Sequence, residues 1–148
     1  MSFQKAHSIS NELGEVVAQA GVNLNEVAIT TLLPINPAFK NYRILEIGWV
    51  CTNNTGSAAL QFNVGTTSGG VELIAPTAAF TIPANSFGTT FSTNTEFAFD
   101  PAGAALDADG IPRLTAGQQI FFDVSVAAGG TATGIVFARL APEINREV

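Results

Sequence analysis

The stretch IFFDVSVAAGGTATGIVFAR, residues 120–139, decides the fold class of this chain. Apolar side chains occupy every second position of its first half, and alternation resumes after the break at Ala128-Gly129-Gly130. Successive side chains of a β-strand point to opposite faces, so a period of two predicts strands and a glycine-rich break predicts a turn. We therefore expect an antiparallel β-hairpin here.

The return strand of this hairpin points to a partner protein. Val136 and Ala138 lie on one predicted face, and Ile135 and Phe137 lie on the other. Two apolar faces are typical of a strand that is covered on both sides. Its own second sheet can cover one face, and a neighbouring subunit is the simplest cover for the other. We predict that Phe121, Ile135 and Phe137 line an oligomer interface.

The same period of two extends upstream through most of the chain. The segments predicted as strands are 24–33, 42–52, 60–64 and 71–74, with a shorter one at 80–82 and room for two in 87–99. A loop is expected over 100–113, and in the second of these strands Leu45, Ile47, Trp49 and Cys51 share one predicted core face. Short strands separated by frequent turns are typical of sandwiches. We expect an all-β fold, a jelly-roll-like antiparallel β-sandwich of about 8 strands.

The N-terminal residues differ from this pattern. Apolar side chains repeat there at helical spacing, at Leu13, Val16, Val17 and Ala20. Ser10 or Asn11 can cap a helix before them, and Gly21 can end it. We therefore expect an arm over residues 1–23 that carries a short amphipathic helix, followed by a single sandwich domain over residues 24–148. Phe3, Leu13, Val16 and Val17 are predicted to contact a larger protein assembly, such as a shell, or a neighbouring subunit.

Composition restricts the classes of partner. Charged residues make up only 12% of the chain, against about 25% in typical soluble domains. A surface of neutral polar groups is easier to bury against another protein, because desolvating ions costs more free energy. The net charge of −6 and the scattered basic residues argue against a nucleic-acid partner. The sequence also has no apolar stretch of membrane-span length and no signal-peptide pattern, so we expect synthesis in a cytoplasm and no membrane partner.

The residues give little sign of catalysis. His7 is the single histidine, and Cys51 sits in an apolar run where a buried, inert thiol is the expected state. We predict no enzymatic activity and no cofactor. Asp107 and Asp109 resemble the start of a calcium loop without its downstream Glu. A solvated loop is the favoured interpretation there, and a weak cation site stays open.

Sugar binding and hydrolysis are the remaining alternatives. A lectin site needs exposed rings, and Trp49 and Tyr42 are the usual candidates, although Trp49 shares its face with predicted core residues. A glycoside hydrolase needs two carboxylates brought together from distant positions. Glu46 and Asp123 are the acids within the most regularly alternating of the predicted strands, and each lies on a face where a solvated or interface role is commoner.

Two resemblances bear on function. The segment from Leu114 to Val126, followed by 133–140, resembles the last strands of trimeric jelly rolls of the tumour-necrosis-factor-like and complement-type heads. The whole chain, acidic and rich in Gly, Thr, Ala and Asn, is similar to bacteriophage capsid decoration (cement) proteins. These resemblances imply a homo-oligomer, with a trimer favoured, bound to the major capsid protein on the capsid surface of a virion. The alternative expectation is a head-fibre or tail-associated module that binds a receptor carbohydrate.

Overall fold

The computed structural model describes residues 15–24, 28–32, 41–55, 59–75, 80–81, 86–90, 104–115, 117–128 and 131–143. These residues form nine strands and no helix. The strands are β1 (Glu15–Asn23), β2 (Ala28–Leu32), β3 (Tyr42–Thr55), β4 (Ala59–Gly65), β5 (Phe80–Thr81), β6 (Ser86–Thr89), β7 (Arg113–Leu114), β8 (Ile120–Ala128) and β9 (Thr131–Pro142).

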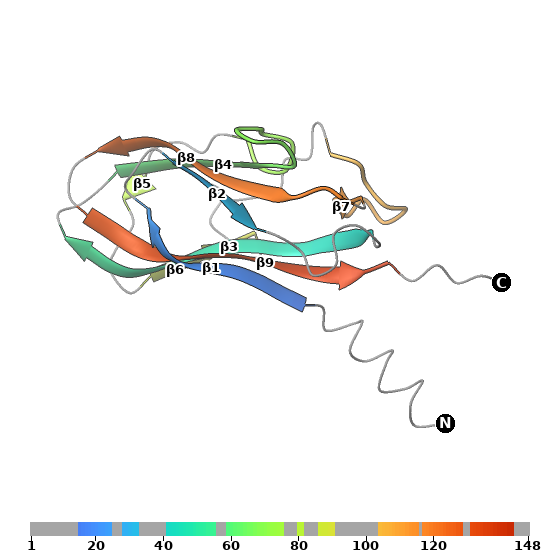
Figure 1. Cartoon of the computed structure of the whole chain (residues 1–148), viewed down its shortest axis with the longest axis horizontal. Coiled ribbons are helices and arrows are strands. Elements are labelled where there is room, and N and C mark those ends of the chain that lie inside the picture. Colours follow the sequence, from blue (N-terminus) through green and yellow to red (C-terminus); the bar gives the residue numbers. More distant parts are fainter. Residues whose placement is uncertain are drawn as a thin grey trace, which may run out of the picture.

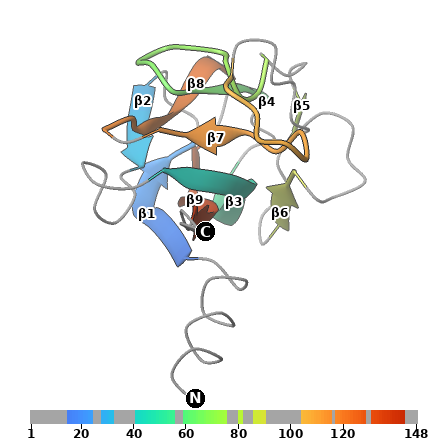
Figure 2. The same cartoon turned by 90° about the vertical axis from the view of Figure 1, so that its right-hand side faces the viewer.

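The strands form two antiparallel sheets that stack as layers (Figures 1 and 2). One sheet has the order β1-β9-β3-β6, with the short β7 also paired to β3, and the other has the order β2-β8-β4-β5. The pairing is nested: β1 with β9, β2 with β8, β3 with β6, and β4 with β5. Such nesting is the strand arrangement of a jelly roll. The predicted fold class, a jelly-roll-like β-sandwich, is confirmed.

The last two strands do not form the predicted hairpin. β8 pairs with β2 and β4, whereas β9 pairs with β1 and β3. The chain therefore crosses from one sheet to the other between Ala128 and Thr131. Each strand finds its hydrogen-bond partners among segments far away in the sequence, which local alternation cannot reveal.

The predicted N-terminal helix is wrong over its second half, because residues 15–23 form β1. Eight residues of this strand are paired with β9, from Glu15 opposite Leu140 to Asn23 opposite Thr133. The body of the sandwich therefore begins by Glu15, not at residue 24 as the predicted arm boundary implied. Residues 1–14, with the first half of that helix, lie outside the described residues.

A bulge changes which face of β3 meets the core. β3 carries one extra residue between Ile44 and Glu46, which lie opposite consecutive residues of β9. A bulge of this kind reverses the alternation of side chains beyond it. Ile44, Ile47, Trp49 and Cys51 are buried, while Leu45 is only half-buried. The prediction that Leu45 shares the core face was wrong by this one residue.

Two other strands differ from their predicted bounds. Of the strand expected over 24–33, the described residues 28–32 form β2, whereas Leu24 pairs with Ala132 just beyond the end of β1. In place of a strand at 71–74 there is one isolated bridge, in which Ile74 faces Val64.

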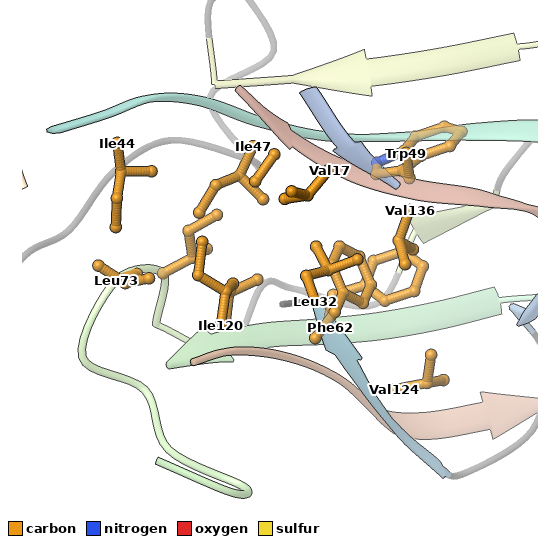
Figure 3. Close-up of a cluster of buried hydrophobic side chains, with 14 of the residues drawn as sticks. Val17, Leu32, Ile44, Ile47, Trp49, Phe62, Leu73, Ile120, Val124 and Val136 are labelled. Atoms are coloured by element: carbon orange, nitrogen blue, oxygen red, sulfur yellow. The ribbon is translucent and has the colours of Figure 1, made fainter. Parts of the chain in front are cut away.

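The core lies between the two sheets. Figure 3 shows Ile47 and Trp49 from one sheet facing Phe62 and Leu32 from the other. The ring of Phe62 lies 4.9 Å from that of Phe122 and 6.4 Å from that of Trp49. Burying each such aromatic ring contributes about 2 kcal/mol to folding. This packing holds the sheets together and leaves their outer faces to solvent or to partners.

Candidate functional site

The outer face of the β1-β9-β3-β6 sheet collects apolar side chains from four strands. Residues directly opposite one another in antiparallel strands point to the same face. The strand register thus produces two apolar rows across the sheet. The first row is Ala18, Phe137 and Gly48, and the second is Ala20, Ile135, Val50 and Phe87. We call these seven residues together with Val16 the apolar face.

The apolar face is accessible at both of its margins. Phe87 on β6 is 68% exposed and Val16 on β1 is 61% exposed. Between them Ile135, Phe137 and Val50 are half-buried by their neighbours in the sheet. Single exposed apolar residues are ordinary, whereas a contiguous group across a sheet marks an interaction surface.

Gly48 makes the centre of this face flat. A side chain at position 48 would have its Cβ 2.5 Å from Cζ of Phe137 and 2.8 Å from the carbonyl oxygen of Gly88. The Phe137 ring therefore covers the glycine and lies along the sheet. A flat apolar surface of this kind can be covered closely by another protein surface.

The charges on this side of the sheet are balanced. Glu46 and Arg139 face each other across β3 and β9, with Nε of Arg139 3.3 Å from Oε2 of Glu46. Their side chains are 19% and 33% exposed. Because this pair is neutral in sum, and the eight residues of the apolar face are uncharged, these described residues add nothing to the net charge of −6 of the whole chain. Another copy of this acidic chain can therefore approach here without like charges meeting.

The outer face of the other sheet is partly occupied by its own chain. Asn63, which points outward from β4, is only 3% exposed, and its Nδ2 donates to the carbonyl oxygen of Gly70 at 2.9 Å. The Glu72 carboxylate stabilises the same turn by accepting from the N–H of Thr66 and the hydroxyl of Thr67. The apolar face therefore has no counterpart of similar openness among the described residues of the second sheet.

The structure places the predicted contact residues in different parts of the sandwich. Val16, Ile135 and Phe137 come together on the apolar face, although Val16 had been assigned to an arm. Val17 is 8% exposed and belongs to the core, so it is withdrawn as a contact residue. Phe121 lies opposite Gly65 and Thr31 on the outer face of the other sheet, away from Ile135 and Phe137. Phe3 and Leu13 lie outside the described residues, as does His7.

Sequence reasoning missed the contribution of Phe87. Nothing local distinguishes this residue from the other phenylalanines, most of which were expected in the core. The outward alternation of Gly48 and Val50 in β3 was visible in the sequence. That β6 would place Phe87 beside Val50 was not visible, because the pairing joins residues far apart in the chain.

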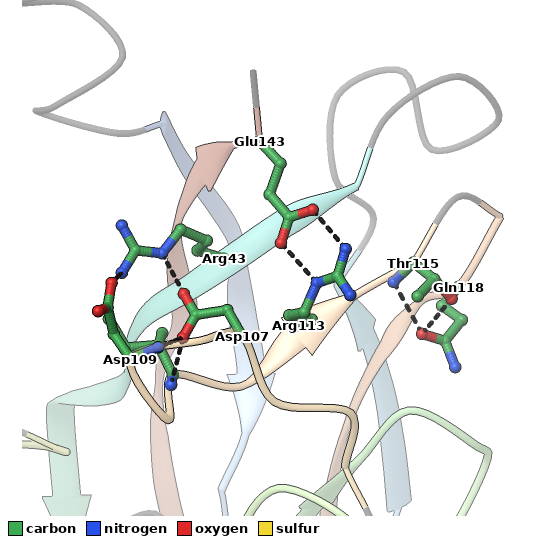
Figure 4. Close-up of polar contacts among 8 residues, drawn as sticks. Arg43, Asp107, Asp109, Arg113, Thr115, Gln118 and Glu143 are labelled. Carbon is green, nitrogen blue, oxygen red and sulfur yellow. Dashed lines mark hydrogen bonds and ion pairs between the residues drawn. The ribbon is translucent and has the colours of Figure 1, made fainter. Parts of the chain in front are cut away.

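A separate polar cluster holds the loop before β7 against β3 (Figure 4). Nε of Arg43 donates to Oδ2 of Asp107 at 2.5 Å, and its Nη2 donates to Oδ2 of Asp109 at 3.1 Å. Oδ1 of Asp107 also accepts from the backbone N–H of Asp109 and of Ile111. The two acids are thus engaged as a latch for their own loop, which favours a structural role over a cation site.

Two further contacts fasten the same end of the sandwich. Nε and Nη2 of Arg113 each donate to an oxygen of Glu143 at 2.6 Å, the two-pronged geometry that guanidinium and carboxylate prefer. Gln118 accepts from both the N–H and the hydroxyl of Thr115. These contacts link β7 to the end of β9 and stiffen the entry to β8.

The contacts of the Asp107 carboxylate predict how the stability of the protein depends on pH. Burial alone would raise the pKa of the Asp107 carboxyl, but hydrogen bonds from Ile111, Arg43 and Asp109 hold it below its ordinary value. A lowered folded-state pKa stabilises the folded protein above the unfolded pKa of about 3.9, and the effect is lost as pH falls through the folded-state pKa. Asp107→Asn should therefore cost about 1 kcal/mol at pH 7, measured by urea unfolding.

The pH series supplies the decisive comparison for this prediction. The difference between wild type and Asp107→Asn should shrink as the pH is lowered below about 3.9. Asp109→Asn is the matched control, because the Asp109 side chain is 75% exposed and should contribute little. A constant difference between wild type and Asp107→Asn from pH 7 to pH 2 would contradict the proposed role of the carboxylate.

The residues considered for chemistry are mostly buried. Trp49 is 3% exposed and Tyr42 is 1% exposed, so neither ring can stack on a sugar. Cys51 is buried, as predicted, and burial raises the pKa of its thiol. Within the described ranges no three His, Cys, Asp or Glu side chains group as metal ligands. The described residues also contain no helix that is long and apolar enough to cross a membrane.

Comparison with protein-family models, with curated proteins and with solved structures finds no match to this chain. The function proposed for the chain therefore rests on its own residues, and above all on the apolar face.

Proposed function

We propose that this chain is a non-enzymatic structural protein of a bacteriophage virion, a decoration (cement) protein that stabilises the shell by bridging neighbouring capsid subunits. The observation that carries the proposal is the apolar face, an open and neutral surface that spans four strands of a jelly roll. The similarity in composition to capsid decoration proteins supplies the setting. The partners are further copies of the chain, with a trimer favoured, and the major capsid protein.

The mechanism is the burial of neutral surface across subunit boundaries. Removing about 100 Å² of apolar surface from water stabilises a contact by roughly 2.5 kcal/mol. The low charge content of 12% reduces the cost of burying the surrounding surface. Symmetric copies repeat each contact, and linked contacts on one shell raise the overall affinity by avidity.

The alternative of a carbohydrate-binding head-fibre or tail module loses support from the burial of Trp49 and Tyr42. Retention of the purified protein on glycan beads would restore that alternative. The structural proposal needs no exposed ring beside a polar groove, only a surface that another protein can cover.

Phe87→Ser tests the proposal directly. Removing this 68% exposed ring should weaken assembly through the apolar face about tenfold or more, because large exposed aromatics are frequent hot spots of interfaces. Light scattering at dilute and moderate concentrations should show a mass closer to that of one chain. Cosedimentation with shells of the phage that encodes the chain should show weaker binding.

The matched control for this test is Val71→Ser. Val71 is 47% exposed but lies in the turn beside the other sheet, so its loss should leave both mass and shell binding unchanged. If Phe87→Ser behaves like Val71→Ser in both measurements, the apolar face is not the assembly surface. Wild-type protein that never binds shells would remove the decoration role itself.

A further inference from the structure

The free edge of β1 is unusual among the edges of this sandwich. β1 ends the strand order of its sheet, and among the described residues no strand pairs with its other side. It is nine residues long, whereas the other described edge strands, β6, β7, β5 and β2, have four, two, two and five. Proteins usually shorten edge strands or guard them with Lys or Pro, because unpaired backbone groups invite another strand. β1 contains neither residue, and its one charge, Glu15, is at its start.

The register identifies the backbone groups that face this edge. The N–H of Thr90 donates to the carbonyl of Ile47, and the N–H of Ile47 donates to the Thr90 hydroxyl. Ile47 thus turns both of its backbone groups away from β9. Ala138, opposite Ile47, must then turn its own groups to β1, where Val17 faces it. Hydrogen-bonded and non-bonded positions alternate in antiparallel strands. Val16, Ala18 and Ala20 therefore direct their N–H and C=O groups outward.

We propose that β1 pairs antiparallel with β1 of a second copy, about a twofold axis through Ala18. This register places Ala18 opposite Ala18 and Val16 opposite Ala20, so every outward-facing position meets another one and each pair exchanges both hydrogen bonds. Glu15 then faces Gly21, and no like charges meet. The bulge at Gly21, whose φ is 69°, ends the regular edge just beyond the paired segment.

A second copy is the occupant that the charges and side chains favour. The chain has a net charge of −6, and the part of this edge from Val16 to Ala20 carries no charge. The side chains of Val16, Ala18 and Ala20 are exposed and small, which allows two identical strands to approach to the usual spacing. The twofold axis stands perpendicular to the sheet, so the apolar faces of the two copies become one continuous surface. A twofold contact uses the same edge of both copies, so it joins two chains and leaves no free edge for a third. It does not depend on the proposed binding to a shell.

Ala18→Pro removes an outward N–H without removing a bond to β9, and proline is tolerated on that side of an edge strand. Because the variant loses the twofold contact, light scattering should show single chains where the wild type forms dimers, and trimers where the wild type forms pairs of trimers. Ala18→Ser keeps the N–H and is the matched control, expected to retain the wild-type mass. Circular dichroism of each variant checks that the sandwich is folded.

A cysteine at the same position tests the contact without disturbing the backbone. Hydrogen-bonded antiparallel pairs have Cα atoms about 5.5 Å apart, within the range for a disulfide. Ala18→Cys should therefore form covalent dimers under mild oxidation, whereas Val71→Cys, at an exposed position in the turn beside the other sheet, should not. Wild type, whose single cysteine is buried, gives the background.

The outcomes separate this inference from the proposed function. Cross-linking through Ala18→Cys with no shell binding would leave the edge contact standing and remove the decoration role. A mass unaffected by Ala18→Pro, or cross-linking of Ala18→Cys no greater than that of Val71→Cys, would overturn the edge contact whether or not shells are bound. The edge would then be open to an extended segment of a different protein.

Discussion

Replacing Gly134 with alanine is expected to lower the free energy of unfolding by about 3 kcal/mol. Gly134 lies on β9 between Val22 of β1 and Cys51 of β3, and points into the sandwich. A Cβ there would overlap the carbonyl oxygen of Val50 and lie 2.9 Å from Cδ1 of Leu24. The Val50 oxygen belongs to the backbone of a central strand, so it cannot move aside without distorting the sheet. Urea unfolding followed by circular dichroism measures the effect.

Two controls separate this steric effect from the loss of a glycine in general. Gly117→Ala should cost only about 1 kcal/mol, because position 117 has a φ of 84° but open space around its Cβ. Adding Leu24→Ala to Gly134→Ala should not restore stability, since the main obstacle is backbone. If Gly134→Ala proved as mild as Gly117→Ala, the close approach of β9 to β3 would be wrong.

Phe62→Ala should be comparably severe, at about 4 kcal/mol. Phe62 is fully buried, and its ring contacts Phe122 within its own sheet and Trp49 in the opposite sheet. Truncation removes the apolar burial and leaves a cavity between the layers. Chemical denaturation followed by Trp49 fluorescence reports on the same contact directly.

Phe62→Leu is the conservative comparison for this site. Leucine refills most of the volume, so the expected cost is about 1 kcal/mol. The contrast between the two variants tests whether packing across the layers, rather than the phenyl ring itself, supplies the stability. A loss below about 1 kcal/mol for Phe62→Ala would contradict the placement of Phe62 in the centre of the core.

The fold class was predictable because it depends on a local property. Alternation of apolar and polar side chains, as in Ile120, Phe122 and Val124, follows from the geometry of a strand in whichever sheet that strand lies. The predicted burial of Cys51 and Trp49 follows from the same alternation and is confirmed, whereas Tyr42 reaches the core only because of the bulge between Ile44 and Glu46.

Which strands pair with each other was not predictable, because strand pairing depends on contacts between segments that are distant in the sequence. The hairpin expected over 120–139 is a crossover between sheets, since β8 and β9 find their partners elsewhere. Residues 15–23 show helical spacing, yet the edge of β9 supplies a hydrogen-bonding partner that makes them a strand. Tertiary pairing outweighs a local preference worth only tenths of a kcal/mol per residue.

The residues of the apolar face were likewise predictable only in part. Alternation in the sequence pointed to Ile135 and Phe137 as outward residues of a two-faced strand, and to the low charge as a sign of protein partners. Tertiary structure alone decided that Val16 and Phe87 join them, that Phe121 lies on the opposite layer, and that Val17 is core. The physical reason is that side-chain direction along a strand is a local matter of backbone geometry. Which strands lie side by side is settled by the packing of the whole chain.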